Sequence, residues 1–361
     1  MKTIIAIFIF GIFASCTSIK EFIEVAAVPR PQHPKKRVYN IKKVKLTNPW
    51  DSTKIAGELT YPKAGTPSKT IVLVSGHSMG DPPAKKNCDV IGHKYFLVLS
   101  DLLTKKGYAV FRFDNRGVGR SSGNWKISTD EDYASDAATA VRWLRENAPY
   151  KITQVGFLGH SQGGFKAPMA ARMVKTDFII RLGSGFSEID ETLVRQSREM
   201  NDATGIDSNI TKEQMRVLAD YLKIIKTAPT YEQSRQQLLE YILKEEPKAP
   251  KKLVQKVLDR SIGSHWMYHS THYDYDSDYK AFKGPVLELF GENDLLVSAK
   301  VNAPKVKALL SNPKSKVHTF KNLNHMFQYT EKALGPEEYG MIKTTIEESV
   351  VDYIDDWLKT F

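Results

Sequence analysis

One serine of this chain lies in a setting typical of hydrolytic nucleophiles. Ser161 is the centre of the run Gly159-His160-Ser161-Gln162-Gly163, which fits the pattern G-x-S-x-G. An apolar strand pattern precedes it at residues 154–158, and an Ala- and Met-rich helical pattern follows it. In this context the small flanking residues permit a sharp, strained turn that exposes the serine hydroxyl. We therefore predict that Ser161 is a nucleophile and that the Gln162 backbone N–H is an oxyanion donor.

A serine hydroxyl reacts only when a base removes its proton and an acid orients that base. Asp294 ends the run Gly291-Glu292-Asn293-Asp294, and His325 ends the run Asn322-Leu323-Asn324-His325; each run follows an apolar strand pattern. The chain order of serine, acid and histidine matches that of a nucleophile-elbow hydrolase. The sequence predicts a triad of Ser161, Asp294 and His325, with Glu292 as the alternative acid.

A second oxyanion donor is expected from the loop after the first parallel strand, which reads Ser75-Gly76-His77-Ser78-Met79-Gly80-Asp81. We predict the His77 N–H, with Ser78 as the alternative. Two other histidines are expected to pack: His160 beneath the turn and His318 sideways from a strand.

The elements that position these residues alternate short apolar runs with helical patterns, which favours an α/β fold with a mostly parallel sheet between helices. Before them, period-two alternation predicts an antiparallel hairpin from residues 38–46 and 55–61. Parallel strands are expected at residues 70–75, 108–113, 154–158, 178–182, 286–290 and 316–320. Helices are expected at residues 93–106, 130–147, 163–175, 299–310 and 339–359. Residues 186–270 have no strand pattern and predict a helical cap between core segments 38–185 and 271–361.

The N-terminal residues have the pattern of an export signal. Lys2 is followed by an apolar run from Ile4 to Ala14, and Ala14-Ser15 stand directly before Cys16. We expect a signal peptide at 1–15, a lipidated Cys16 with a Pro-containing tether at 16–37, and a membrane-anchored lipoprotein of the bacterial cell envelope. The alternative is an ordinary secretory signal in which Cys16 is incidental. Cys88 then stays as a lone, structurally neutral thiol.

Several other functions are disfavoured by the sequence. The net charge of +11 is spread over the whole chain without a nucleic-acid-binding motif, so no nucleic-acid partner is expected. The loop 114–123 contains G-x-G but lacks the spacing of a phosphate-binding turn, and Asp114 and Arg116 are expected to be structural. His265, His269 and His272 lie among tyrosines, and an aromatic lid segment is favoured over a metal site. Catalysis by the triad needs neither metal nor cofactor.

The motifs together resemble a known family. GHKYFLVLSDLLTKKGYAVFRFDNRGVGRSSG, GFLGHSQGGFKAPMAAR, GPVLELFGENDLLV and NLNHMF are similar to the exported bacterial α/β-hydrolase carboxylesterases related to the serine aminopeptidase-like group. The resemblance implies esterase action on short acyl chains by Ser161, Asp294 and His325. This chain departs from the family in its oxyanion loop, GHSMGDPPAKKNCD, and in having Gln162 where Glu is common.

These observations lead us to expect a serine carboxylesterase that acts on a small-molecule ester. A peptidase or amidase is the alternative, in which Glu188, Asp190 and Glu191 at the start of the cap would bind a substrate amine. A binding lipoprotein that keeps the fold without catalysis is the third possibility.

Overall fold

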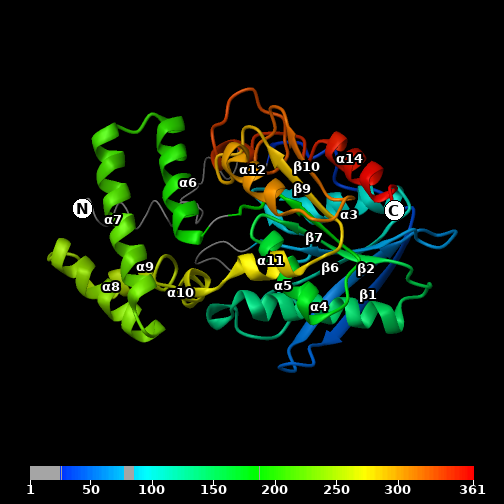
Figure 1. The fold of residues 1–361 in the computed structure, drawn as a ribbon, viewed down its shortest axis with the longest axis horizontal. Coiled ribbons are helices and arrows are strands. Elements are labelled where there is room, and N and C mark those ends of the chain that lie inside the picture. Colours follow the sequence, from blue (N-terminus) through cyan, green and yellow to red (C-terminus); the bar gives the residue numbers. More distant parts are fainter. Residues whose placement is uncertain (1–24, 26, 77–84, 187) are drawn as a thin grey trace.

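The protein is built around one twisted sheet. The computed structural model describes residues 25, 27–76, 85–186 and 188–361, and within them an eight-stranded sheet has the order β1-β2-β6-β3-β7-β8-β9-β10 (Figure 1). β1 and β2 are antiparallel, as are β2 and β6, and the remaining neighbours are parallel. The strands are β1 (Asn40–Thr47), β2 (Lys54–Tyr61), β3 (Thr70–Val74), β6 (Ala109–Phe113), β7 (Val155–His160), β8 (Phe178–Leu182), β9 (Val286–Gly291) and β10 (Lys316–Phe320).

Helices cover both faces of this sheet, because the central strands are apolar on both sides and must be shielded from water. α3 (Tyr95–Lys105) and α14 (Glu348–Leu358) share one apolar core with the sheet. α4 (Asp130–Asn147), α5 (Gly163–Met173), α11 (Tyr275–Ala281) and α12 (Ala299–Leu309) share the other. The predicted fold class, an α/β-hydrolase fold with a mostly parallel sheet flanked by helices, is confirmed.

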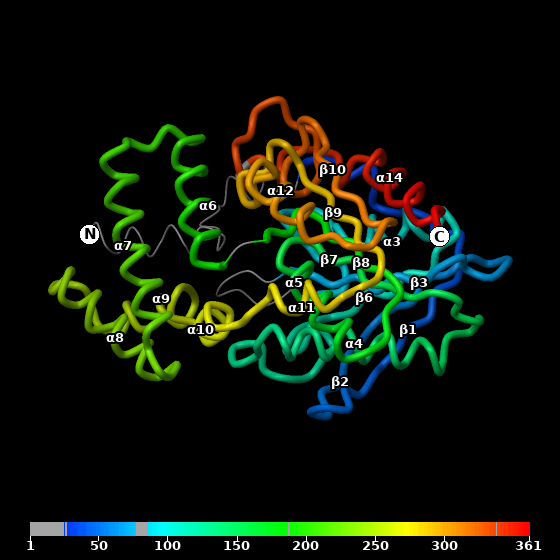
Figure 2. The backbone as a smooth tube through the Cα atoms, viewed as in Figure 1, coloured from blue at the N-terminus to red at the C-terminus, as the bar shows by residue number. Residues whose placement is uncertain are grey.

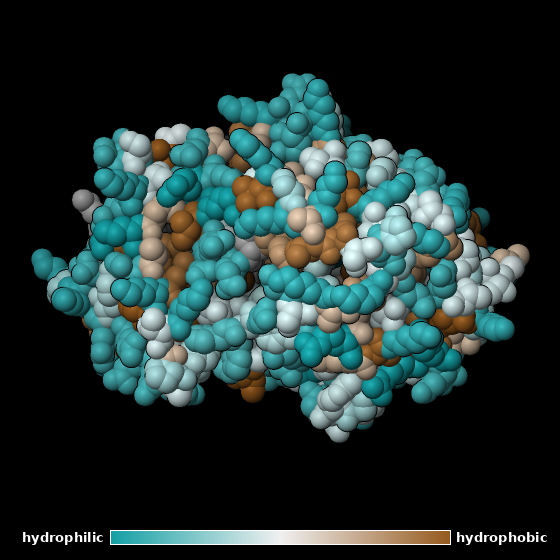
Figure 3. All heavy atoms as spheres, in the orientation of Figure 1, coloured by the Kyte–Doolittle hydropathy of each residue, from teal (hydrophilic) through white to brown (hydrophobic). Residues whose placement is uncertain are grey.

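The segment between β8 and α11 forms a helical cap. It contains α6 (Ile189–Thr204), α7 (Ser208–Thr227), α8 (Tyr231–Glu245), α9 (Lys251–Leu258) and α10 (His265–His272), which enclose an apolar core of their own. Figures 1 and 2 show these helices grouped on one side of the sheet domain, with α10 leading back to it. On the face drawn in Figure 3 most of the surface is hydrophilic, and apolar side chains gather between α6 and α7.

The segment predicted to be a tether is bound to the C-terminal part of the core where the structure describes it. Arg30 donates to the carbonyls of Gly340, at 2.5 Å, and Ile342, at 2.6 Å. Gln32 accepts from Thr345 N at 2.7 Å and donates to the carbonyl of Ile346 at 2.9 Å. Ile346 N also donates to Gln32 Oε1 at 3.2 Å, so five backbone groups of residues 340–346 are satisfied by two side chains.

The predicted helix at 339–359 is wrong over its first third. The chain forms only α13 (Pro336–Tyr339) and then a turn before α14 begins at Glu348. Backbone groups in that turn bind distant side chains instead of forming helical hydrogen bonds, as with Gln328 Nε2, which donates to the carbonyl of Thr344 at 2.8 Å. Three further short elements complete the described chain: β4 (Asp89–Val90), β5 (His93–Lys94) and the 3-10 helix η1 (Trp125–Ile127).

Candidate active site

Ser161 lies at the turn between β7 and α5. Its φ is 55°, a left-handed conformation that is unusual for a residue with a side chain. The backbone N–H of Ser161 donates to the carbonyl of Leu182 at 2.8 Å, which fixes the turn to the end of β8. Gly163 makes the close approach possible, because a Cβ there would lie 2.0 Å from the carbonyl oxygen of Val74. The sequence prediction of a strained strand-to-helix turn at Ser161 agrees with this geometry.

Asp294 and His325 meet on the two loops that follow β9 and β10. His325 Nδ1 lies 2.8 Å from Asp294 Oδ2, and both side chains are buried. The other carboxylate oxygen, Oδ1, accepts from the backbone N–H groups of Leu296 and Val297, each at 2.8 Å. Because the carboxylate is fixed from both sides, it holds the proton of His325 on Nδ1 and leaves Nε2 as the basic nitrogen.

His325 packs against His160, the residue before Ser161, and against Gly183, the residue after Leu182. The ring of His160 lies 4.9 Å from the ring of His325, and His160 Nε2 donates to the backbone carbonyl of His325 at 3.0 Å. On the other side is Gly183, the residue after Leu182; a Cβ there would lie 3.2 Å from His325 Nδ1 and 3.3 Å from Asp294 Oδ2. The three predicted triad residues are thus brought to the same end of the sheet.

His160 is a packing residue, as expected from the sequence. Its ring lies between those of His325 and Tyr95, with the Tyr95 ring centroid 4.8 Å away. Burial, followed by the nearby His325, lowers the pKa of His160 to about 3. The low pKa makes His160 a weak base, which fits a packing role.

The alternative acid is directed elsewhere. Glu292 is exposed, and its Oε2 accepts from the backbone N–H of Asn322 at 3.1 Å. His318 stacks on Tyr353 with ring centroids 4.4 Å apart, which agrees with the expectation that it packs beside the strand. Among the hydrogen bonds of the described chain, neither Glu292 nor His318 bonds to Asp294 or to His325.

The oxyanion side of the site is described in part. Gln162 precedes the first residue of α5, where backbone N–H groups lack helical partners and favour negative charge. A Cβ on Gly76 would lie 3.4 Å from Ser161 Cβ and 3.5 Å from Gln162 N, so Gly76, two residues after the end of β3, lies directly beside Ser161. His77, the predicted second donor, and its alternative Ser78 lie outside the described residues.

The loop that follows β6 is tied together by buried charges. Asp114 accepts from the backbone N–H groups of Lys86, at 2.8 Å, and Arg120, at 3.1 Å. Arg116 forms ion pairs with Asp136 at 2.8 Å and Asp51 at 2.7 Å. These contacts fit the structural roles expected for Asp114 and Arg116.

The histidines of α10 make aromatic and local contacts. The rings of His265 and His269 lie 4.4 Å apart, and His272 Nδ1 lies 2.7 Å from the carbonyl of Tyr268 in the preceding turn. In the part of the chain that the structure describes, no group of three metal-ligating side chains has the geometry of a metal site.

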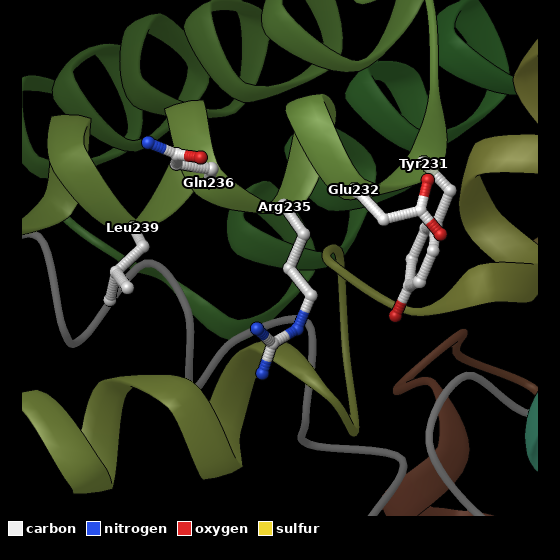
Figure 4. Close-up of a pocket in the computed structure, with 5 residues that line it drawn as sticks. All are labelled: Tyr231, Glu232, Arg235, Gln236 and Leu239. Atoms are coloured by element: carbon white, nitrogen blue, oxygen red, sulfur yellow. The ribbon is translucent and has the colours of Figure 1, made fainter.

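A hollow in the cap lies apart from these residues. It has a volume of about 500 Å³ and is lined by side chains of α8, namely Tyr231, Glu232, Arg235, Gln236 and Leu239 (Figure 4). Arg235 in its wall is paired with Asp259 at 2.6 Å. No triad residue lines it, so we do not assign it as the reaction site.

Sequence reasoning missed one buried carboxylate beside the turn. Asp130, the first residue of α4, accepts a hydrogen bond from the Gln162 side chain at 3.0 Å. The sequence shows Asp130 only as an acidic residue in the first turn of a helix, which is a common location for Asp. Trp266 and Tyr275, which also donate to it, are more than 100 positions away, so no local pattern could have indicated these contacts.

The sheet topology, the serine turn and the buried Asp–His pair together define an α/β-hydrolase. Comparison with known proteins agrees: the chain belongs to the X-Pro dipeptidyl-peptidase (S15) family, whose model matches residues 31–319. Over 305 residues it is 26% identical to Esterase EstD of Thermotoga maritima, which covers 84% of this chain. The match spans 65% of the length of that relative.

Solved structures show the same fold. An esterase from Pyrococcus furiosus matches with a TM-score of 0.53 at 17% identity, covering 92% of this chain and 97% of that one. The α/β-hydrolase GrgF from Penicillium sp. sh18 matches with a TM-score of 0.55 at 14% identity, covering 89% and 98%. The resemblance to α/β-hydrolase esterases predicted from the sequence motifs is therefore confirmed.

Proposed function

We propose that this chain is a serine hydrolase that cleaves carboxylic esters with small or short acyl groups through an acyl-enzyme on Ser161. The observation that carries the proposal is the 2.8 Å contact of His325 with Asp294, held beside a serine whose φ is 55°. The similarity to a named esterase supports ester hydrolysis as the reaction.

The proposed reaction has two halves. His325 Nε2 takes the proton of the Ser161 hydroxyl while Oγ attacks the ester carbonyl carbon, and the oxyanion is stabilised by the N–H groups of Gln162 and His77. The tetrahedral intermediate expels the alcohol, which receives the proton from His325. Water then attacks the acyl-enzyme by the same route, and Asp294 stabilises the imidazolium in both halves.

Purified chain and a Ser161→Ala variant test this proposal with p-nitrophenyl acetate and a fluorophosphonate probe. We expect the native chain to hydrolyse the ester and to be labelled at Ser161, and the variant to lose both. Hydrolysis at the native rate by Ser161→Ala would refute the role of Ser161. A native chain that is neither labelled nor active would favour a non-catalytic binding lipoprotein. A panel of esters of increasing acyl length, with acetylated and feruloylated sugars, would then define the substrate.

Peptide or amide hydrolysis is the second candidate, because the family description is that of a peptidase. The acidic residues suggested from the sequence as an amine-binding site are engaged by lysines. Lys226 pairs with Glu188 at 3.6 Å and with Asp190 at 2.9 Å, and Lys305 lies 3.9 Å from Glu191. We therefore do not assign an amine site to these three residues.

Glu199 on α6 is a better candidate for binding a substrate ammonium group. It is half-buried; burial raises the pKa of its carboxyl, the positive charge of Arg195 lowers it, and the negative charge of Asp294 raises it further. Comparison of p-nitrophenyl acetate with glycyl-proline p-nitroanilide separates the two activities. If the amide is a substrate, Glu199→Gln should lower its turnover while ester turnover is kept; equal loss on both would exclude this assignment.

We also propose that the chain is exported and anchored through lipid on Cys16, which lies outside the described residues. In the described part of the chain no helix has the length and apolar character needed to cross a membrane. Metabolic labelling with palmitate in a bacterial host tests the anchor. Label should be incorporated into the native chain and lost in Cys16→Ala; labelling of both would refute the assignment of Cys16.

A further inference from the structure

A buried carboxylate, Asp130, connects the nucleophile turn to the segment that leads out of the cap. Its side chain is 2% exposed. Gln162 Nε2 donates to its Oδ2 at 3.0 Å, from the residue directly after the nucleophile. The indole of Trp266 donates to Oδ1 at 3.1 Å, and the hydroxyl of Tyr275 donates to Oδ2 at 2.5 Å. Trp266 is on α10 and Tyr275 begins α11, so one side chain binds three separate elements around the turn.

The Gln162 side chain has a single hydrogen-bonding anchor in the described chain. Its Nε2 is bound to Asp130, while its Oε1 is buried and has no hydrogen-bond partner among the described atoms. The orientation of the Gln162 side chain therefore depends on Asp130, and the backbone carbonyl of the same residue accepts from Phe165 N at 3.0 Å in the first turn of α5. The backbone N–H of Gln162 is the proposed oxyanion donor.

Asp130 also reaches Ser75, the residue after β3, through Lys166. The Lys166 ammonium is buried on α5, lies 3.7 Å from Asp130 Oδ1 and donates to the carbonyl of Ser75 at 3.4 Å. Ser75 begins the loop that contains the predicted donor His77. A buried ammonium needs a compensating anion, so Asp130 permits Lys166 to bind the Ser75 carbonyl.

We propose that Asp130 is a positioning residue that couples the return segment, residues 265–275, which leads from α10 of the cap into α11, to Gln162 and, through Lys166, to Ser75. The proposal rests on the ester hydrolysis proposed above. When the return segment packs as in this structure, Trp266 and Tyr275 orient the Asp130 carboxylate. The carboxylate in turn orients the side chains of Gln162 and Lys166. Catalytic rate thereby depends on residues of the return segment, which do not belong to the triad.

The hydrogen bond to Asp130 gives a physical reason for Gln, and not Glu, at position 162. An amide donates to Asp130, whereas a glutamate would place two carboxylates within hydrogen-bond distance of each other in a buried location. Like charges that close repel strongly when they are shielded from water. Gln therefore fits position 162 beside Asp130 better than Glu would.

The experiment removes one donor to Asp130 while keeping the carboxylate paired with Lys166. Tyr275→Phe deletes the hydroxyl bound to Asp130. Tyr273→Phe is a matched control, because its hydroxyl binds a different carboxylate, Asp278, at 2.6 Å in the same segment. Asp130→Asn is less suitable, since it would leave Lys166 buried without a counter-charge and endanger folding.

Three quantities are measured with the full chain: kcat and KM for p-nitrophenyl acetate, and the inhibition constant of a trifluoromethyl ketone, which adds to the serine to form a tetrahedral oxyanion. For Tyr275→Phe we expect kcat to fall and the inhibition constant to rise by the same factor, about tenfold, as for loss of a hydrogen bond to a charged group. KM should stay within about twofold, because an oxyanion defect acts on the transition state. Tyr273→Phe should change none of the three by more than about twofold.

A double-mutant cycle tests the route of the coupling. Gln162→Leu removes the side-chain amide and keeps the backbone N–H. In that background Tyr275→Phe should lose most of its effect, since its link to the oxyanion donor is already broken.

Several results would overturn the proposal. These are equal behaviour of the two tyrosine variants, a rise in KM with kcat intact, an unchanged inhibition constant, or full additivity in the cycle. If native chain shows neither ester hydrolysis nor fluorophosphonate labelling, the proposed function itself fails. If native chain is active and Tyr275→Phe is indistinguishable from it, only the role of Asp130 fails.

Discussion

Gly183 packs against the side chains of Asp294 and His325, and adding one methyl group at position 183 tests this packing. In Gly183→Ala the new Cβ would lie 3.2 Å from His325 Nδ1 and 3.3 Å from Asp294 Oδ2. Ordinary van der Waals contact begins near 3.4 Å, so the imidazole and carboxylate must retreat by a few tenths of an ångström. The φ of Gly183 is +53°, which adds a backbone penalty of about 1 kcal/mol for a residue with a Cβ.

The effect on rate follows from the size of that displacement. A misplacement of about 1 Å in catalytic geometry costs roughly 100-fold in rate, and about a third of that distance corresponds to roughly fivefold. We therefore expect Gly183→Ala to reduce kcat for p-nitrophenyl acetate about fivefold and to lower the free energy of unfolding by about 1 kcal/mol.

Gly205 supplies the matched control. It ends α6 with φ +73°, and a Cβ there meets nothing within 4 Å. Gly205→Ala should lose similar stability in urea unfolding and keep its kcat. If Gly183→Ala keeps full kcat while losing stability, the close packing of Gly183 against the Asp–His pair is refuted. If both variants lose the same activity, the loss reflects general destabilisation.

Three other changes have defined outcomes. Asp294→Asn should lower kcat by about 10⁴ because an amide favours the wrong tautomer of His325, and a loss below about tenfold in steady-state assays would contradict the role of Asp294. Burial lowers the pKa of His93 from 6.5 to about 4, so the unfolded chain takes up a proton there before the folded chain does. Stability should fall as pH drops from 6.5 towards 4, and urea midpoints of His93→Gln should fall less; equal slopes would exclude His93 as the cause. Burial raises the pKa of Cys88 to about 12, and a thiol reagent at pH 8 should label it only after denaturation; rapid labelling of folded protein would contradict its burial.

The sequence was sufficient wherever a local pattern decides the structure. The strand β8, Phe178–Leu182, and the helix α4, Asp130–Asn147, have the predicted bounds. Both are continuous periodic segments, and α4 also begins with a capping box in which Thr129 and Asp132 bind each other's backbone N–H. The serine turn was predictable for the same reason, since glycines, strand and helix are adjacent in the chain.

The sequence was insufficient where a single polar side chain binds distant backbone. Arg30 and Gln32 bind residues more than 300 positions away, and this contact accompanies the turn that interrupts the predicted C-terminal helix. Asp130 has the same character, with partners on α5, α10 and α11. Neither case leaves a periodic pattern in the sequence, because isolated side chains make these contacts.

If Cys16 carries the proposed lipid, the attachment of Arg30 to Gly340 and Ile342 limits how far the catalytic domain can move from that lipid. A fully extended chain from position 16 to position 30 spans at most about 50 Å. The tethered domain would then meet ester groups on the same membrane at an effective concentration on the order of millimolar, as do two partners joined by a short linker. On the proposed lipidation, weak intrinsic affinity for such a substrate would suffice for turnover at the membrane surface.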